Sequence, residues 1–112
     1  MKLIKAYIRY RMVGQVYEAL KTEGYVSMTF VECEGTGKYS NHEKAYISDK
    51  FPGDANPVIK LEILIKKKDT SRIVDLIRKS ARTGYRGDGM ILISNVENVF
   101  KIRTDDEGFD VI

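Results

Sequence analysis

The chain has 112 residues, within the usual size of one domain, and its 43% hydrophobic and 31% charged residues exclude a disordered chain. The formal net charge of +3 is a weak excess, but acidic residues gather near the C-terminus, and the more basic remainder suits an anionic ligand while falling short of a nucleic-acid-binding stripe. One cysteine excludes an internal disulfide framework, and no apolar run is long enough to span a bilayer. A strand-like pattern follows Met1 directly, so we expect no cleaved leader, no membrane insertion and a cytoplasmic location.

The first half of the chain predicts two strands, one helix and a long loop. Residues 2–10 alternate in polarity as a strand does, and residues 13–20 have the apolar spacing of a helix that ends at Gly24. Residues 25–34 are rich in aromatic and β-branched types and predict a second strand. Residues 35–57 have no sustained period, and loops of this length inside a compact domain tend to be functional or disordered.

The second half repeats this order. Residues 59–65 alternate cleanly and predict a third strand, after which Asp69 is a candidate N-cap for a helix with apolar positions within residues 73–81. Residues 91–94 and 99–103 are again strand-like.

Strand–helix–strand repeated twice predicts an α+β protein with the ferredoxin-like split βαβ sandwich. Its order is βαββαβ plus a short C-terminal strand, and residues 1–112 form a single domain. Two helices cover only one face of such an antiparallel sheet. We therefore expect other subunits to pack against the second face.

The segment Thr83-Gly84-Tyr85-Arg86-Gly87-Asp88-Gly89 places three glycines within six positions, directly between a helix and a strand. Glycines allow a ligand to approach the backbone, and successive N–H groups can form a concave anion site to which Arg86 adds charge. The glycine count alone favours an ordinary tight connection. The phosphate-loop pattern and the dinucleotide pattern are both absent.

A second glycine pair, Gly35-Thr36-Gly37-Lys38, ends the second strand and opens the long loop. Lys101 and Arg103 are expected on one face of the last strand, at period-two spacing. Each feature alone is an ordinary turn or a solvated charge. If the two glycine segments meet across a subunit boundary, these residues together form a basic, glycine-lined pocket.

Glu34-Gly35-Thr36-Gly37, Thr83-Gly84-x-x-Gly87-Asp88-Gly89-x-Ile91 and Arg103-Thr104 resemble the PII signal-transduction family (nitrogen regulatory protein P-II). The similarity runs nearly end to end and includes Met28-Thr29 and Glu107-Gly108. It implies a homotrimer that binds ATP or ADP in clefts between subunits. It also implies that a flexible T-loop, about residues 36–57, docks onto transporters, enzymes or regulators.

The resemblance and the two glycine segments together predict the site residues. The expected nucleotide-binding residues are Thr29, Gly35, Thr36, Gly37, Lys38, Leu64, Arg86, Gly87, Asp88, Gly89, Met90, Lys101 and Arg103. The expected partner-binding residues of the loop are Tyr39, His42, Tyr46 and Phe51.

Lys101 stands where the family commonly has arginine, and the chain departs from the family pattern at four further functional positions. Tyr39 replaces a glutamine that helps to organise Mg-ATP and 2-oxoglutarate, and Val58 replaces a lysine that pairs with the oxoacid, so we do not expect 2-oxoglutarate to bind in the usual way. Met90 replaces a phosphate-contacting lysine for which Arg86 is only a partial substitute, and Mg²⁺ binding is left open. Phe51 replaces the tyrosine that is uridylylated in many members, so that modification cannot occur there.

Several alternatives stay open. The same fold could sense a different effector, such as AMP, a cyclic dinucleotide, bicarbonate or a metal. A lone loop histidine such as His42 is usually solvated, and no metal ligand is predicted. An enzyme is disfavoured because no nucleophile–base pair or carboxylate pair is evident. An RNA-recognition domain lacks its basic-aromatic strand motif, so no nucleic-acid partner is expected.

Overall fold

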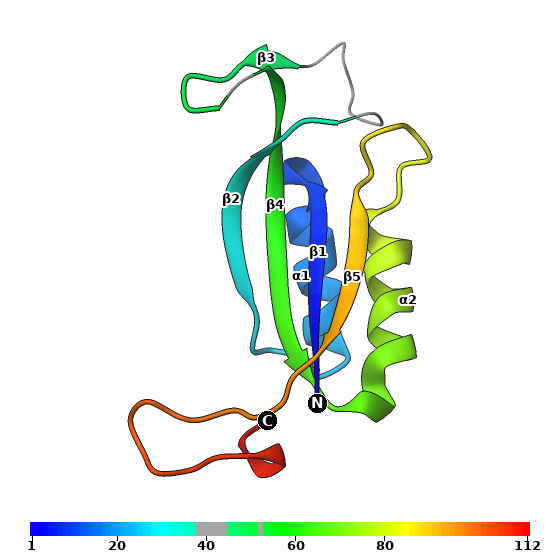
Figure 1. The fold of residues 1–112 in the computed structure, drawn as a ribbon. Coiled ribbons are helices and arrows are strands. Elements are labelled where there is room, and N and C mark those ends of the chain that lie inside the picture. The colour runs from blue at the N-terminus through cyan, green and yellow to red at the C-terminus, as the bar shows by residue number, and fades with distance from the viewer. Residues whose placement is uncertain (38–44, 52) are drawn as a thin grey trace.

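The structure, a computed structural model, describes residues 1–37, 45–51 and 53–112 (Figure 1). Its strands and helices, in chain order, are β1 (Lys2–Arg9), α1 (Val13–Thr22), β2 (Thr29–Gly35), β3 (Tyr46–Ile47), β4 (Asp54–Ile65), α2 (Thr70–Ala81) and β5 (Met90–Asn95). Short 3-10 turns precede the two helices at Tyr10–Met12 and Lys67–Asp69, and a third one, Phe109–Val111, lies near the C-terminus.

The sheet is antiparallel, with the strand order β2-β4-β1-β5, and β3 pairs with the beginning of β4. Each strand–helix–strand unit is therefore split by a strand of the other unit. β4 lies between β1 and β2, and β1 lies between β4 and β5. The predicted α+β ferredoxin-like architecture is confirmed.

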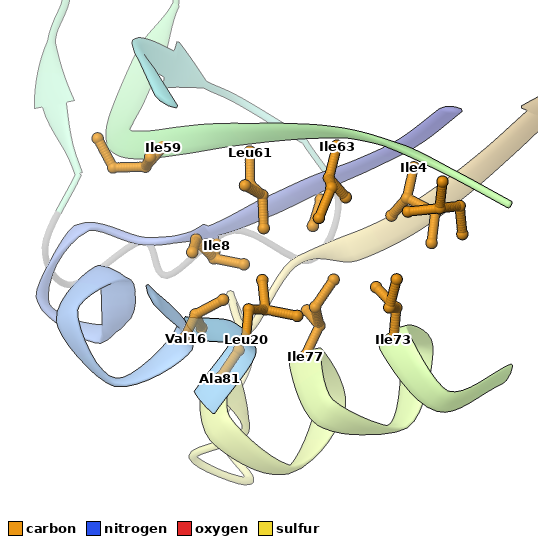
Figure 2. Close-up of a cluster of buried hydrophobic side chains, with 12 residues drawn as sticks. Ile4, Ile8, Val16, Leu20, Ile59, Leu61, Ile63, Ile73, Ile77 and Ala81 are labelled. Carbon is orange, nitrogen blue, oxygen red and sulfur yellow. The ribbon is translucent and has the colours of Figure 1, made fainter. Parts of the chain in front are cut away.

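The core lies between the sheet and the two helices (Figure 2). Alternate residues of the two central strands point toward the helices because side chains alternate between the faces of a strand. Apolar side chains at helical spacing on α1 and α2 meet them, and burying each such side chain contributes roughly 1.5–3 kcal/mol. The fully or almost fully buried residues are Ile4, Ala6, Ile8, Val16, Leu20, Ile59, Leu61, Ile63, Ile65, Ile73, Ile77 and Ala81.

The opposite face of the sheet has no covering layer within the described ranges. It presents the alternate residues of the same strands, among them Leu3 and Tyr7 of β1 and Lys60, Glu62 and Leu64 of β4. Lys60 and Glu62 form an ion pair of 3.2 Å there, and this carboxylate raises the pKa of Lys60. We call this surface the open face.

Two predicted boundaries are corrected. The second strand begins at Thr29 instead of residue 25, and β3 and the first part of β4 lie in a range that was predicted to be loop. The chain forms a strand here despite its loop-like sequence, because Pro57 and the residues before it pair with β2 and with β3. Gly24 follows α1 as predicted.

The predicted strand at residues 99–103 is wrong for the single chain. That segment makes only an isolated bridge between Phe100 and Glu107, and Figure 1 shows it projecting from the body. Phe100 is 67% exposed and Ile102 is fully exposed. A strand needs a neighbouring strand for its backbone hydrogen bonds, and none of the described strands lies beside this segment.

Asp69 stands at the N-cap position of α2, as predicted, but its side chain makes no capping hydrogen bond. The 3-10 turn that precedes the helix gives Asp69 a helical backbone conformation, whereas a capping residue has an extended one.

Gly89 fixes the glycine-rich turn against β1. Its φ is +100°, and a Cβ at this position would stand only 1.6 Å from the carbonyl oxygen of Tyr7. No side chain fits there, because the turn must approach the β1 backbone before Met90 pairs with Tyr7.

We predict that Gly89→Ala lowers the free energy of unfolding by about 3 kcal/mol, because the methyl group would separate β5 from β1. Gly84→Ala is the matched control, since Gly84 has a similar φ of +90° but no atom within 4 Å of the point where its Cβ would stand. The control should cost only about 1 kcal/mol. Urea denaturation at fixed protein concentration measures both, and equal losses would contradict the steric argument.

Candidate functional site

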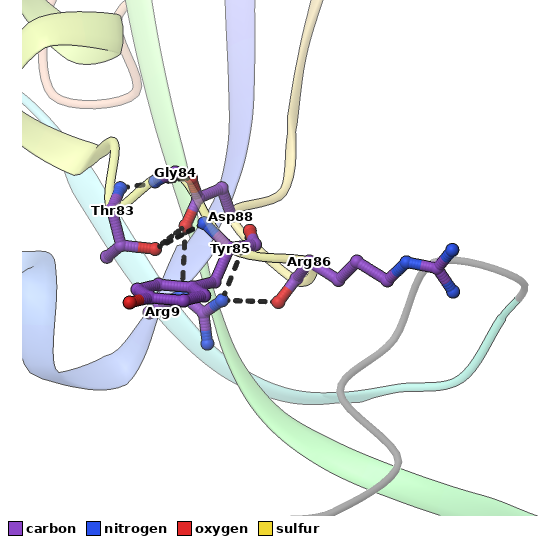
Figure 3. Close-up of polar contacts among 6 residues, drawn as sticks. All are labelled: Arg9, Thr83, Gly84, Tyr85, Arg86 and Asp88. Atoms are coloured by element: carbon purple, nitrogen blue, oxygen red, sulfur yellow. Dashed lines mark hydrogen bonds and ion pairs between the residues drawn. The ribbon is translucent and has the colours of Figure 1, made fainter.

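The turn between α2 and β5 is organised by the carboxylate of Asp88 (Figure 3). Asp88 accepts hydrogen bonds from the backbone N–H groups of Thr83 at 3.0 Å and Gly84 at 2.9 Å, and from the hydroxyl of Thr83. The Thr83 hydroxyl oxygen in turn accepts one from the N–H of Tyr85 at 3.2 Å. The first three N–H groups of the turn are therefore satisfied inside it.

Arg9, the last residue of β1, joins this network from the neighbouring strand. Its Nε donates to Asp88 Oδ1 at 3.0 Å, and its Nη2 donates to the carbonyl oxygens of Tyr85, at 3.4 Å, and Arg86. The Arg9 side chain is only 13% exposed. The sequence gives no indication of these Arg9 contacts, because a polar residue at an alternate position of a strand looks like any other residue of the uncovered face. The acidic residue inside a glycine-rich turn was the one feature that called for a cationic partner.

The charge of Asp88 is strongly stabilised. Burial alone would raise its pKa, but the hydrogen bonds from Thr83, Gly84 and Arg9 outweigh burial and lower the pKa to about 2. Asp88 is thus an anion at neutral pH whose oxygens contact the turn and Arg9. This arrangement gives it a structural role within the predicted site.

The two glycine segments lie at the same end of the sheet. A Cβ on Gly35 would stand 2.9 Å from Val58 Cγ2, Val58 pairs with Arg9 across β4 and β1, and Arg9 holds the turn. Three strand spacings separate β2 from β5, which corresponds to about 14 Å. Thr36 and Gly37 follow Gly35 and are exposed, whereas the predicted residues Lys38, Tyr39 and His42 lie outside the described residues.

Other predicted nucleotide-binding residues lie on the open face or point into solvent. Thr29 pairs with Glu62, Leu64 pairs with Leu3, and Met90 is 63% exposed at the start of β5. The Arg86 side chain points away from the Arg9–Asp88 network (Figure 3).

Lys101 and Arg103 do not reach this end of the sheet. Both are exposed and lie on the segment that projects at the other end of the molecule, far from the glycine-rich turn (Figure 1). The predicted basic, glycine-lined pocket is therefore not assembled by one chain.

The beginning of the long loop is tied to its later part by Glu34. This carboxylate accepts hydrogen bonds from the hydroxyls of Tyr46, at 3.0 Å, and Ser48. The Ser48 oxygen accepts from the N–H groups of Lys50 at 3.2 Å and Phe51 at 2.9 Å. Phe51 is 58% exposed, so a side chain that was predicted to contact a partner is available at the surface.

The described part of the chain contains no group of three or more His, Cys, Asp or Glu side chains that could hold a metal ion. None of its helices is long and apolar enough to cross a membrane.

Comparison with known proteins gives one consistent family. A family model described as "Nitrogen regulatory protein P-II" matches residues 1–106. Proteins of that name from Bradyrhizobium diazoefficiens, Pyropia yezoensis and Rhizobium meliloti are 38%, 37% and 36% identical to this chain over 112 residues. Each comparison covers 100% of both chains.

We predict that Asp88→Asn lowers the free energy of unfolding by about 2 kcal/mol at pH 7. The pKa of Asp88 in the folded chain, about 2, lies below its ordinary value of 3.8. The carboxylate therefore stabilises the fold above about pH 4, and this contribution is lost as the pH falls toward about 2. Urea unfolding across this range should show the difference from the unsubstituted chain shrinking with acidity. Asp75→Asn, on α2, is the control, and a pH-independent difference for Asp88→Asn would contradict the prediction.

We further predict that Glu34→Gln accelerates hydrogen exchange of the Lys50 and Phe51 backbone N–H groups about threefold to tenfold. A glutamine side chain offers one acceptor oxygen in place of two, so it holds less firmly the Ser48 hydroxyl to which both N–H groups donate. Glu32→Gln is the matched control, since Glu32 lies on the same strand and its side chain has no hydrogen bond or ion pair to another described residue. Exchange measured by NMR tests this, and equal rates in the two variants would show that Glu34 does not restrain the loop.

Proposed function

The chain belongs to the nitrogen regulatory protein P-II family, and we propose that it is a signalling protein that binds ATP or ADP between the subunits of a homotrimer. We propose that it acts by binding and not by catalysis, in keeping with the family. The observation that supports an inter-subunit site is the separation of its parts. The glycine segments lie at one end of the sheet, and Lys101 and Arg103 lie on a segment that projects at the other end.

The uncovered apolar surface supports assembly. Phe100 and Ile102 are exposed on the projecting segment, and Leu92 is 44% exposed on the open face. Side chains of this size normally gain stability from burial, and a second subunit can cover them. In that arrangement the cations of one subunit's projecting segment would approach the glycine segments of the next.

The loop would carry the signal to a partner protein. Its first residues follow Gly35 at the nucleotide site, and Ile47, which is 83% exposed, and Phe51 offer apolar contacts to a transporter, an enzyme or a regulator. A nucleotide changes the loop only if it contacts one loop conformation better than another, because equal affinity for both shifts nothing.

Selectivity among effectors follows from Val58 and Met90. Val58 packs against Gly35 with an aliphatic group, so it supplies no charge for an oxoacid, and we propose that 2-oxoglutarate does not bind in the family's usual way. Met90 offers no charge to a phosphate beside the turn. This favours, as the second candidate, a sensor of AMP, a cyclic dinucleotide, bicarbonate or a metal ion.

We predict that ATP and ADP bind the purified protein, that 2-oxoglutarate does not bind with or without Mg²⁺, and that Arg103→Ala weakens nucleotide affinity about tenfold. The reason for the loss is that a guanidinium–phosphate contact is charge-assisted. Calorimetry measures the affinities, and light scattering measures the subunit number. Lys79→Ala, an exposed cation on α2, is the control and should leave the affinity unchanged.

The outcomes separate the two candidates. AMP, a cyclic dinucleotide, bicarbonate or a metal ion binding more tightly than ATP and ADP would favour the second candidate. Absence of binding by every adenine nucleotide tested would overturn the first.

A further inference from the structure

We propose that Arg9 is a positioning residue for the phosphate site. Its guanidinium holds two carbonyl groups of the glycine-rich turn inward, which makes the next two N–H groups point outward toward a phosphate. This inference rests on the proposed nucleotide binding and adds to it a residue of β1 that lies outside the predicted site.

The orientation of the N–H groups follows from the geometry of the peptide bond. In a trans peptide the C=O and the following N–H point in opposite directions, and the described residues contain no cis peptide. The carbonyl oxygens of Tyr85 and Arg86 both accept hydrogen bonds from Arg9 Nη2. The N–H groups of Arg86 and Gly87 must therefore point away from Arg9.

Neither of these two N–H groups has an acceptor among the described groups of the turn. The N–H groups of Thr83 and Gly84 donate to Asp88, and that of Tyr85 donates to the Thr83 hydroxyl. Those of Arg86 and Gly87 donate to no other group in the described ranges. Two successive N–H groups that point the same way form a concave site suited to an anion.

The charge balance shows that Arg9 acts through the turn and does not itself serve as the phosphate's cation. Its Nε lies 3.0 Å from Asp88 Oδ1, and this carboxylate neutralises the guanidinium locally. The backbone also lies close to it, since a Cβ on Gly87 would stand 3.3 Å from Arg9 Nη2. A planar guanidinium can donate to the carboxylate and to both carbonyls at once, whereas a lysine presents one compact ammonium.

The test is Arg9→Lys, with adenosine, AMP and ADP as probes in calorimetry. We expect the affinity for ADP to fall about tenfold while that for adenosine changes less than about twofold, because only phosphate binding depends on the two N–H groups. A general loosening of the fold would instead lower the affinities for adenosine, AMP and ADP alike. Arg11→Lys is the matched control, since Arg11 is exposed and has no ion pair to the described residues.

A second measurement reads the site directly. In NMR titrations with inorganic pyrophosphate, the Arg86 and Gly87 amide signals of the unsubstituted protein should shift, and Arg9→Lys should reduce those shifts. ADP binding that is equal in Arg9→Lys and the unsubstituted protein, or amide shifts that are unchanged, would overturn the role of Arg9 and leave the proposed function standing. If the unsubstituted protein binds none of the three ligands, the proposed function fails, and this inference fails with it.

Discussion

The contact between Arg9 and Asp88 joins the end of β1 to the turn that precedes β5. Without a fixed turn, Met90 would not enter the sheet beside Tyr7, and the edge strand would lose its register. Further hydrogen bonds hold both partners in place. Asp88 also accepts hydrogen bonds from N–H groups of the turn, and Arg9 also donates to carbonyl oxygens of the turn. One ion pair, mostly shielded from solvent, thus defines both a strand boundary and the shape of a candidate binding surface.

From that contact a continuous path of neighbours leads to the loop. Arg9 pairs with Val58, Val58 packs against Gly35, and the preceding Glu34 binds the hydroxyls of Tyr46 and Ser48. The path crosses all strands between β5 and β2, so the turn and the base of the loop lie at the same end of the sheet and are joined by a chain of direct neighbours. In the proposed mechanism a ligand at either glycine segment would act on the loop along this path, and coupling measurements would give the effect a magnitude.

The sequence predicted the fold because its periodicities were strong. The clean alternation of β4 from Ile59 to Ile65 and the helical spacing of α2 both match the structure. Prediction was wrong where stability comes from a neighbour instead of local pattern. Pro57 and the residues before it look like loop but pair within the sheet, and the segment around Ile102 looks like a strand but lacks a neighbouring strand in the described chain.

The candidate site was predictable only in part, for a related reason. Glycine spacing and family resemblance point to backbone positions such as Gly35 and Gly87. Arg9 could not be found this way, because its partner is 79 residues away and its position on a strand resembles that of any solvated cation. The separation of Arg103 from the turn is equally invisible in a linear pattern, since it depends on where the last segment leaves the sheet.

The projecting C-terminal segment has a thermodynamic consequence. In the proposed trimer the ligand touches two subunits, so it binds the assembled protein and not the separate chain. Assembly and occupancy are then linked: the ligand lowers the concentration at which subunits associate, and dilution releases ligand as it releases subunits. A protein built in this way has a third variable besides nucleotide and partner, namely its own abundance in the cell.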